Sequence, residues 1–385
     1  MEVFFSILMV SLFFVTIKNK YFLPIFFIAL IGSNPYVTAG SLLLTLITRF
    51  KTVFKSDVNR SLFIFCSLWL CYSFIVGTVK YNTAFVSEFI QLTLSIMLLF
   101  YIYNSINNKE EFYKNIKYLM YSGILLCLIK VVIDVFELNI STSAFIDYKT
   151  NNYASFYILI TTVVTPLLII KKKLYCILTI LLGVYVISIN DSRANLIIAL
   201  LLIAKEFISF KSYFLKFIVI CLFSYVFYYF YNAFDSSSLF DNTSLYSVLN
   251  FENNFSNLER LNLIMYSFDL FNLNLLGNGL GSSFDLFFNN KVTVNNHYPH
   301  PHNTLAFLAV ELGVVGILIY LLFFYNIIKS YKKIIDIDVK RFILNITISL
   351  FIFSFVDVLF YNGILMLFTF ILLGLSSVAS KLSFK

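Results

Sequence analysis

Long apolar runs separated by short polar segments dominate the pattern of hydrophobic and polar positions along the chain. Most runs are continuously apolar over a length near the roughly 20 residues that a helix needs to cross a membrane. Because apolar and polar residues do not alternate, the runs predict helices and not the strands of a membrane barrel. Candidate spans cover residues 61–79, 86–105, 118–136, 153–170, 174–190, 194–210, 213–233, 303–328, 342–357 and 363–380.

The first fifty residues add two or three further candidates, which brings the expected total to about 12 spans. Residues 1–17 lack a basic leading segment and a small-residue cleavage site, so they predict a first span and not a cleaved signal peptide. The chain is therefore predicted to be an all-α protein that crosses the membrane many times.

The polar segments predict which ends of the spans face the cytoplasm. Basic residues gather at 49–60, 109–117, 171–173, 205–216 and 329–341, and near the C-terminus. Neighbouring basic segments are separated by room for two spans, so all of them are placed on the cytoplasmic side, where loops are enriched in Lys and Arg. The loops on the opposite side contain few basic residues.

Composition supports this class. Hydrophobic residues make up 60% of the chain and charged residues only 12%, whereas a soluble domain has about a quarter of its residues charged. The net charge of +8 is accounted for by the cytoplasmic loops, so nucleic acid is not an expected partner. All five cysteines lie inside apolar runs and are interpreted as small core residues, not as a disulfide framework.

One outer loop, residues 234–302, is long enough to suggest a function. It contains a predicted helix at 257–271, whose apolar residues recur at helical spacing as expected for a helix on the membrane surface. These residues are Leu258, Leu261, Ile264, Met265 and Phe268. The glycine-rich segment 277–283, GNGLGSS, follows as a predicted turn, because no strand and no Lys-Ser/Thr pair accompany it.

Three charged residues outside the cytoplasmic loops are candidates for chemistry. Arg193 lies in NDSRAN between two spans, and it either binds an anion or snorkels beside Asp191. Arg260 lies on the loop helix and, taken alone, is better interpreted as a solvated charge. Asp357 is a lone acid near the outer end of span 342–357 and needs a partner or water.

The only histidines of the chain, His297, His300 and His302, stand at the entrance to span 303–328. Their density permits a metal site, but Pro299 and Pro301 interrupt regular geometry and no cysteine lies outside the membrane, so no metal is predicted. A loose loop that happens to contain histidines is the other alternative. A neutral imidazole at this position can accept a proton, as a general base must.

The span that follows His302 favours a site over a loose loop. At 100° per residue, four small residues fall within about 40° of the His302 direction and form a strip that a helix or a lipid chain can approach closely. The strip consists of Ala306, Ala309, Gly313 and Gly316. Asn303 and Thr304 are candidates for capping the helix, and Glu311 on the opposite side is expected to brace the bundle.

Three segments together resemble the O-antigen polymerase and O-antigen ligase superfamily of bacteria. HNTLAFLAVELGVVG resembles its His-Asn, nine residues, Gly-x-x-Gly signature, and SRAN resembles its Ser-Arg motif at the start of a span. ERLNLIMYSFDLFNLNLLGNGLGSSF resembles its arginine-containing outer helix and Gly-x-Gly turn. The order of the segments agrees. The resemblance covers roughly 150–380 and divides the chain into N-terminal spans, 1–150, and a catalytic membrane region, 151–385.

The resemblance implies a fold similar to C-type glycosyltransferases and a lipid-linked sugar donor on the periplasmic side of the inner membrane. His302 would be the base, Arg193 and Arg260 would hold the undecaprenyl pyrophosphate, and Asp357 and His300 would assist. Asn303, Gly313 and Gly316 belong to the signature and are assigned to substrate binding. No cofactor or metal is expected, and membrane lipids and a chain-length regulator protein are expected partners.

The function implied is that of an O-antigen polymerase, which transfers a glycan to the hydroxyl of a lipid-linked repeat unit. The alternative is an O-antigen ligase, which transfers the glycan to lipid A-core. A flippase or transporter is disfavoured, because such proteins carry repeat symmetry and ionisable groups near the middle of the membrane. Here the charged residues gather beside the long outer loop.

Overall fold

A computed structural model describes residues 40, 42–43, 46–53, 59–82, 84–136, 152–190, 192–208, 255–289, 300–360 and 363–382, and all described elements are helical. The predicted spans before residue 40, the span 213–233 and His297 lie outside the described residues. The helices are α4 (Phe50–Val53), α5 (Arg60–Val79), α6 (Phe85–Ser105), α7 (Lys109–Val135), α8 (Asn152–Ile158), the π-helix η1 (Leu159–Val164), α9 (Pro166–Ile169), α10 (Lys173–Ile189), α11 (Arg193–Ile208), α14 (Phe255–Leu273), α15 (Ser282–Asn289), α16 (Thr304–Lys333), α17 (Ile337–Val356) and α18 (Gly363–Lys381).

The protein is a multi-pass membrane protein. Among the described residues, seven helical segments are long and apolar enough to span a membrane: α5, α6, α7, the continuous segment Asn152–Ile169, α16, α17 and α18. Each matches a predicted span, and α10 is a shorter apolar helix where span 174–190 was predicted. A total of 12 spans stays a prediction.

The start of α7 differs from the predicted span 118–136. The helix begins at Lys109, because the side chain of Asn108 accepts the N–H of Glu111 at 2.8 Å and the Glu111 carboxylate accepts the N–H of Asn107 at 2.9 Å. These reciprocal bonds satisfy N–H groups that a helix start leaves open. The hydropathy pattern predicts only the apolar part of this helix and not its polar first turns, which the cap stabilises.

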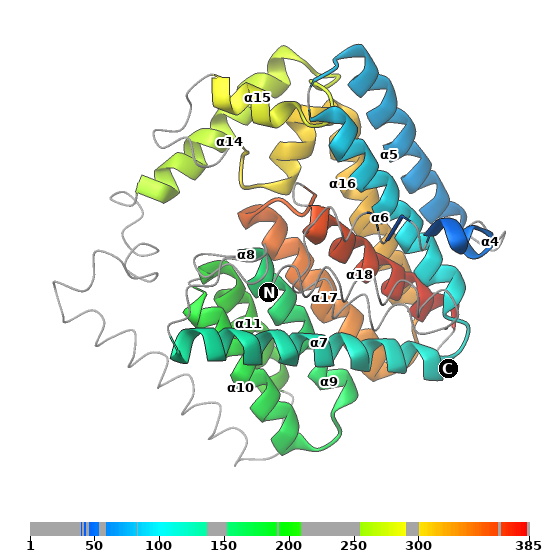
Figure 1. Ribbon diagram of the computed structural model, residues 1–385, viewed down its shortest axis with the longest axis vertical. Coiled ribbons are helices and arrows are strands. Elements are labelled where there is room, and N and C mark those ends of the chain that lie inside the picture. Colours follow the sequence, from blue (N-terminus) through cyan, green and yellow to red (C-terminus); the bar gives the residue numbers. More distant parts are fainter. Residues whose placement is uncertain are drawn as a thin grey trace.

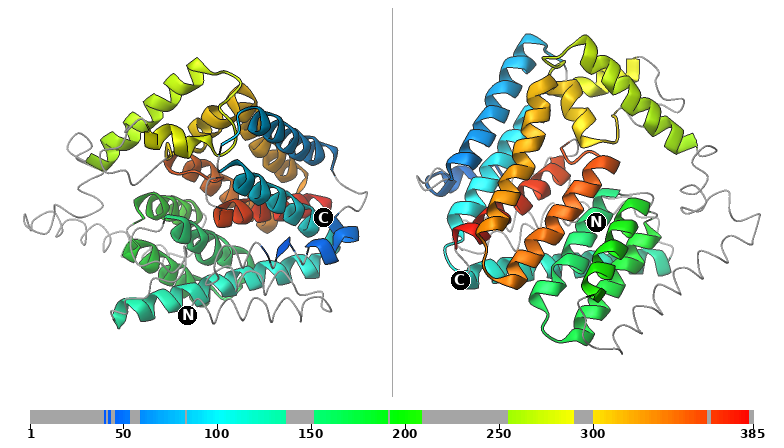
Figure 2. Two further views of the ribbon diagram at one scale, coloured as in Figure 1. Left: turned by 45° about the horizontal axis from the view of Figure 1, so that its top comes forward. Right: turned by 180° about the vertical axis from the view of Figure 1, so that it is seen from behind.

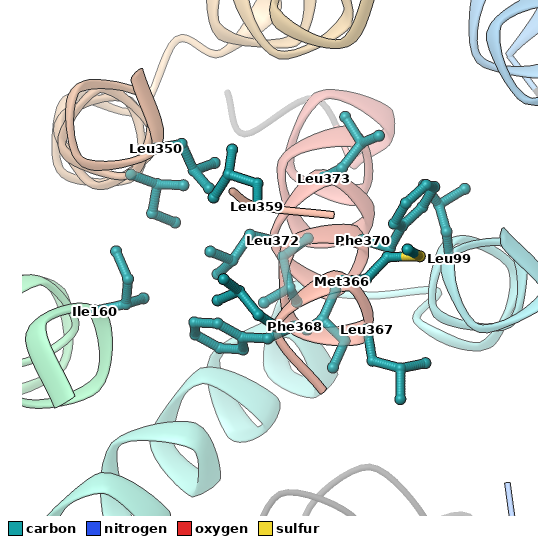
Figure 3. Packing of buried hydrophobic residues seen from close by; sticks show 14 of the residues in the cluster. Leu99, Ile160, Leu350, Leu359, Met366, Leu367, Phe368, Phe370, Leu372 and Leu373 are labelled. Atoms are coloured by element: carbon teal, nitrogen blue, oxygen red, sulfur yellow. The ribbon is translucent and has the colours of Figure 1, made fainter. Parts of the chain in front are cut away.

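Helix α18 lies at the centre of the bundle and packs most extensively on α6 (Figure 1). Of its most apolar window 89% is buried inside the protein, against 39% for α5. A helix that is apolar on all sides is covered by other helices or by lipid, and α18 is covered by other helices. Figure 3 shows Leu99 of α6, Ile160 of η1 and Leu350 of α17 converging on Phe368, Phe370 and Leu372 of α18.

This core joins the two regions predicted at 1–150 and 151–385, because α6 and α18 contribute to the same buried cluster. The division of the chain at residue 150 stays a prediction. Helices α8, α10 and α11 form a group beside α17, and α14 and α15 lie beside the N-terminal end of α16 (Figures 1 and 2). Segments far apart in sequence thus meet where α11, α14, α16 and α17 begin or end.

Candidate active site

His302 stands immediately before α16 in a constrained backbone conformation. Its φ is 45°, the left-handed region that few residues other than glycine adopt. Asn303 follows as the N-cap and accepts the N–H of Ala306 at 2.9 Å, which confirms it as a capping residue. Proline at 301 favours an extended backbone at His300. The chain therefore turns sharply at His302, and non-glycine residues in such conformations are concentrated at functional sites.

Asp357 is the nearest acidic partner of His302. It caps the C-terminus of α17, and its Oδ1 lies 3.6 Å from His302 Nδ1. The two side chains are only 3% and 6% exposed, so each must be stabilised by the protein and not by water. Oδ1 of Asp357 also accepts the N–H of Val358 at 2.9 Å. This carboxylate therefore faces His302 in a fixed orientation.

Thr304 joins the two elements that carry this pair. Its hydroxyl donates to the carbonyl of Asp357 at 2.9 Å and accepts the N–H of Leu359 at 3.0 Å. Thr304 is fully buried at the first turn of α16. One hydroxyl thus holds the start of α16 against the link between α17 and α18, and so sets the distance between His302 and Asp357.

His300 packs against His302, with ring centroids 4.4 Å apart, and its Nδ1 accepts the backbone N–H of His302 at 3.4 Å. Burial lowers the pKa of His300 to about 3, and His302 and Arg260 act in the same direction, while Asp357 opposes them. His300 is therefore a neutral acceptor at neutral pH. The effect of Arg260 on this pKa also shows that the guanidinium of α14 lies within electrostatic reach of the cluster.

Asp357 remains an anion at neutral pH. Burial raises the pKa of its carboxyl group, but the nearby imidazole of His302, the charge of His300 and the Val358 N–H together lower it below its usual value. A buried carboxylate beside a histidine stabilises the protonated imidazole. The pair is thus suited to accept a proton on the imidazole and to hold the resulting charge.

His300, His302 and Asp357 are also donor types that bind metal ions, and their ligand atoms lie within 4.8 Å of one another. Arg260 opposes a positive charge on His300, whereas Asp357 favours one. The expectation of a site without metal stays a prediction.

Arg193 is the first residue of α11, and it is half-buried. The turn before it is connected to Asp357 through Asn152 at the start of α8. Asn152 Nδ2 donates to Asp357 Oδ2 at 3.1 Å, and the Ser192 hydroxyl donates to Asn152 Oδ1 at 2.9 Å. The Ser-Arg turn and the histidine segment therefore meet at Asp357, although more than a hundred residues separate them in sequence.

Helix α14 carries Arg260 and packs on α16, and its Tyr266 ring contacts the Phe287 ring of α15 with centroids 5.4 Å apart. Leu263 and Leu270 form a small buried cluster with Phe287 and Val310. Of the apolar face predicted from sequence, Leu261, Met265 and Phe268 are exposed and Ile264 is half-buried. The placement of this face on the membrane surface stays a prediction.

The Gly-x-Gly turn after α14 interrupts α16. Gly313 lies inside this helix with φ 61° and ψ −144°, which is not helical. The backbones approach so closely that a Cβ at Gly313 would lie 2.1 Å from the Leu275 carbonyl oxygen, and a Cβ at Gly277 would lie 2.4 Å from that of Glu311. The straight small-residue strip predicted from the helical wheel is therefore wrong beyond Gly313. The neighbour at Gly313 is a loop backbone, neither another helix nor a lipid.

Three backbone hydrogen bonds bridge the interruption: Asn278 N–H to Val310 O at 3.0 Å, Gly279 N–H to Glu311 O at 2.9 Å and Val314 N–H to Leu275 O at 2.9 Å. Open backbone groups inside a membrane need protein partners, and the turn supplies them. Gly316 is buried against the carbonyl of Leu308 in the preceding part of α16. Gly313 thus contributes to the junction between α16 and the turn that follows α14, whereas Gly316 allows a close approach within α16 itself. Their assignment to substrate binding stays a prediction.

Glu311 braces this junction, as predicted. Its carboxylate is 1% exposed and accepts the backbone N–H of Ser283 at 3.3 Å. Lys80 Nζ donates to the carbonyl of Gly277 at 3.0 Å, and Asn82 Nδ2 donates to that of Leu280 at 2.9 Å. The connection between α5 and α6 therefore holds the turn from the other side.

Residues 176–321 match the family model described as O-antigen ligase. The matched segment runs from α10 through α11, α14 and α15 into α16, and contains Arg193, Arg260 and His302. Asn152 and Asp357 lie outside it. Proteins of this family transfer glycans from lipid-linked donors. No curated protein matches the chain.

Sequence reasoning singled out His300, His302 and Asp357, and the structure brings them into one cluster. Arg260, also singled out, lies within electrostatic reach of His300. Sequence reasoning missed Asn152, and it considered Thr304 only as a capping candidate, whereas the N-cap is Asn303 and Thr304 bonds the link between α17 and α18. A signal was present for Asn152, because this polar residue opens an apolar span. The partners of both residues could not be inferred, since these lie on other elements.

Proposed function

We propose that the protein is a periplasmic-side glycosyltransferase, an O-antigen polymerase that moves a glycan from undecaprenyl pyrophosphate to a hydroxyl of a lipid-linked repeat unit. The observation that carries the proposal is the buried pair of His302 and Asp357, with Arg260 within electrostatic reach of the adjacent His300. In this proposal the imidazole of His302 accepts a proton, and the Asp357 carboxylate 3.6 Å from its Nδ1 stabilises the resulting positive charge. The Arg260 guanidinium would stabilise the negative charge on the leaving pyrophosphate.

In the proposed step, the acceptor hydroxyl loses its proton to His302 as its oxygen bonds to the anomeric carbon. The bond from that carbon to the pyrophosphate oxygen breaks, and its electron pair leaves with the undecaprenyl pyrophosphate. Arg193 and Arg260 stabilise the negative charge that builds on this leaving group. A single displacement inverts the anomeric configuration. The proton and the charge are thus handled by different residues, and no metal is needed.

The orientation of the site is supported by charge at the opposite end of α17. There a cleft of about 810 Å³ is lined by Lys114, Lys117 and Lys171 together with Asp338. Asp338 is near the start of α17 and Asp357 is at its end, so the two sites lie at opposite ends of a helix of 20 residues. This length corresponds to about 30 Å, the thickness of the hydrocarbon layer. Because lysines favour the cytoplasmic side, we place the His302 cluster on the periplasmic side.

The second candidate function is O-antigen ligase, because the matching family model carries that description. Deletion of the gene followed by electrophoresis of the lipopolysaccharide distinguishes the two. Loss of the ladder with a single repeat on the core supports the polymerase. Bare core with long glycan on the carrier lipid supports the ligase and contradicts the polymerase. Unchanged banding contradicts both.

A further inference from the structure

Asn152 occupies a central position between the two motifs of the site. It is the first residue of α8, and its side-chain amide uses both ends: Nδ2 donates to Asp357 Oδ2 at 3.1 Å, and Oδ1 accepts from the Ser192 hydroxyl at 2.9 Å. A carboxylate can only accept hydrogen bonds, so the NH₂ group of the amide must face Asp357. The orientation of the amide is therefore determined.

Asn195 secures the same connection from α11. Its Nδ2 donates to the backbone carbonyl of Asn152 at 3.0 Å and to the hydroxyl of Ser192 at 2.8 Å. Ser192 and Asn195 are 2% and 0% exposed, so water does not compete for these bonds. Ser192 is bonded directly to Arg193 in the chain. A displacement of the arginine turn is thus transmitted to Asn152.

Asp357 receives this connection on one oxygen and faces His302 with the other. Oδ2 accepts from Asn152, while Oδ1 accepts the Val358 N–H at 2.9 Å and lies 3.6 Å from His302 Nδ1. Two donors from different elements therefore set the rotation of the carboxyl group. Without the Asn152 donor, the Val358 N–H alone would leave the group free to rotate about its last bond.

We propose that Asn152 is a positioning residue: together with Ser192 and Asn195 it orients Asp357 toward His302 and fixes the distance between the arginine turn and the base. The inference rests on the proposed function and deepens it. In the proposed step Asn152 contacts neither the glycan donor nor the hydroxyl acceptor. The Asn152 amide would thus link the position of His302, which takes the proton, to that of the Arg193 turn, which binds the leaving group.

The test compares Asn152→Asp with Asn152→Ala in purified protein that transfers glycan from a polyprenyl-pyrophosphate-linked oligosaccharide. Asn152→Asp keeps the shape of the side chain but sets a second carboxylate against Asp357, which then turns away from His302 or takes up a proton. We expect kcat to fall about 100-fold in Asn152→Asp and about 10-fold in Asn152→Ala, with KM for the donor unchanged. Ser192→Ala should give a smaller fall in kcat.

The order of the two variants separates positioning from packing, because loss of packing alone would make Ala the more harmful change. Asn190→Asp is the matched control: Asn190 is 2% exposed in the same region and donates to the hydroxyl of Ser155 at 3.1 Å, which can bond a carboxylate equally well. Its activity should stay near that of the unsubstituted protein. Thermal unfolding verifies that every variant is folded.

Full activity of Asn152→Asp, a greater loss in Asn152→Ala, or an equal loss in Asn190→Asp would each overturn the inference while leaving the proposed function in place. No transfer by the unsubstituted protein with either a lipid-linked repeat unit or lipid A-core as acceptor would overturn the proposed function, and the inference with it.

Discussion

His302 and Asp357 belong to opposite ends of the α16–α17 hairpin in sequence, yet Nδ1 of the histidine lies 3.6 Å from Oδ1 of the aspartate. The reason is geometric. Helix α16 begins, and helix α17 ends, on the same side of the bundle, and the Thr304 hydroxyl joins the two ends. The antiparallel arrangement of α16 and α17 thus brings His302 and Asp357 together, and the hydroxyl of Thr304 joins the two helix ends.

Removal of the base should abolish transfer. We expect His302→Ala to lower kcat by about 10³-fold, and Asp357→Asn, which keeps the shape but removes the charge beside the imidazole, by about 10². The rate is measured with a radiolabelled lipid-linked donor. Asp338→Asn, at the opposite end of α17, is the control and should keep full activity. Retention of activity by His302→Ala would rule out this residue as the base.

The two arginines should act on the donor pyrophosphate. Arg193→Lys and Arg260→Lys keep the charge but lose the forked geometry that binds two phosphate oxygens at once. We expect each substitution to lower kcat/KM about 100-fold. Arg341→Lys, near the start of α17 and far from the histidine cluster, keeps an exposed charge and should leave activity unchanged. If either site variant matched Arg341→Lys in activity, that arginine would not contact the leaving group.

Gly313 should tolerate no side chain. In Gly313→Ala the Cβ would lie 2.1 Å from a backbone oxygen of the turn, at a φ that alanine rarely adopts. We expect the free energy of unfolding to fall by about 2 kcal/mol or more, seen as a lower unfolding temperature in detergent. Transfer should fall as well, because the turn couples Arg260 to α16. For Gly40→Ala, whose Cβ would meet no described atom within 4 Å, stability should be unchanged.

His300 should make stability depend on pH. Its pKa is lowered from 6.5 to about 3 in the folded protein, so the unfolded chain binds a proton first as the pH falls. Stability is therefore complete above pH 6.5 and declines between about pH 6.5 and 3, with a slope of about 1.4 kcal/mol per pH unit for one proton. Unfolding temperatures measured across this range should show a flatter profile in His300→Gln. An unchanged profile would mean that other groups carry the dependence.

The sequence by itself determined the membrane class, the spans that the structure describes and the residues of the histidine cluster. Long apolar runs leave the backbone one way to satisfy its hydrogen bonds in lipid, which is to form helices, so periodicity and length suffice. Few polar residues stand at the outer ends of these helices, so each could be weighed singly. His302 and Asp357 were found in this way.

Only the tertiary structure decided how the helices meet. The interruption of α16 at Gly313 depends on hydrogen bonds from a turn thirty-odd residues earlier, and no local pattern encodes that contact. The role of Asn152 likewise depends on Asp357 and Ser192, which belong to other helices. Local sequence sets which backbone groups a helix leaves open, whereas the partners that satisfy them are chosen by packing between distant segments.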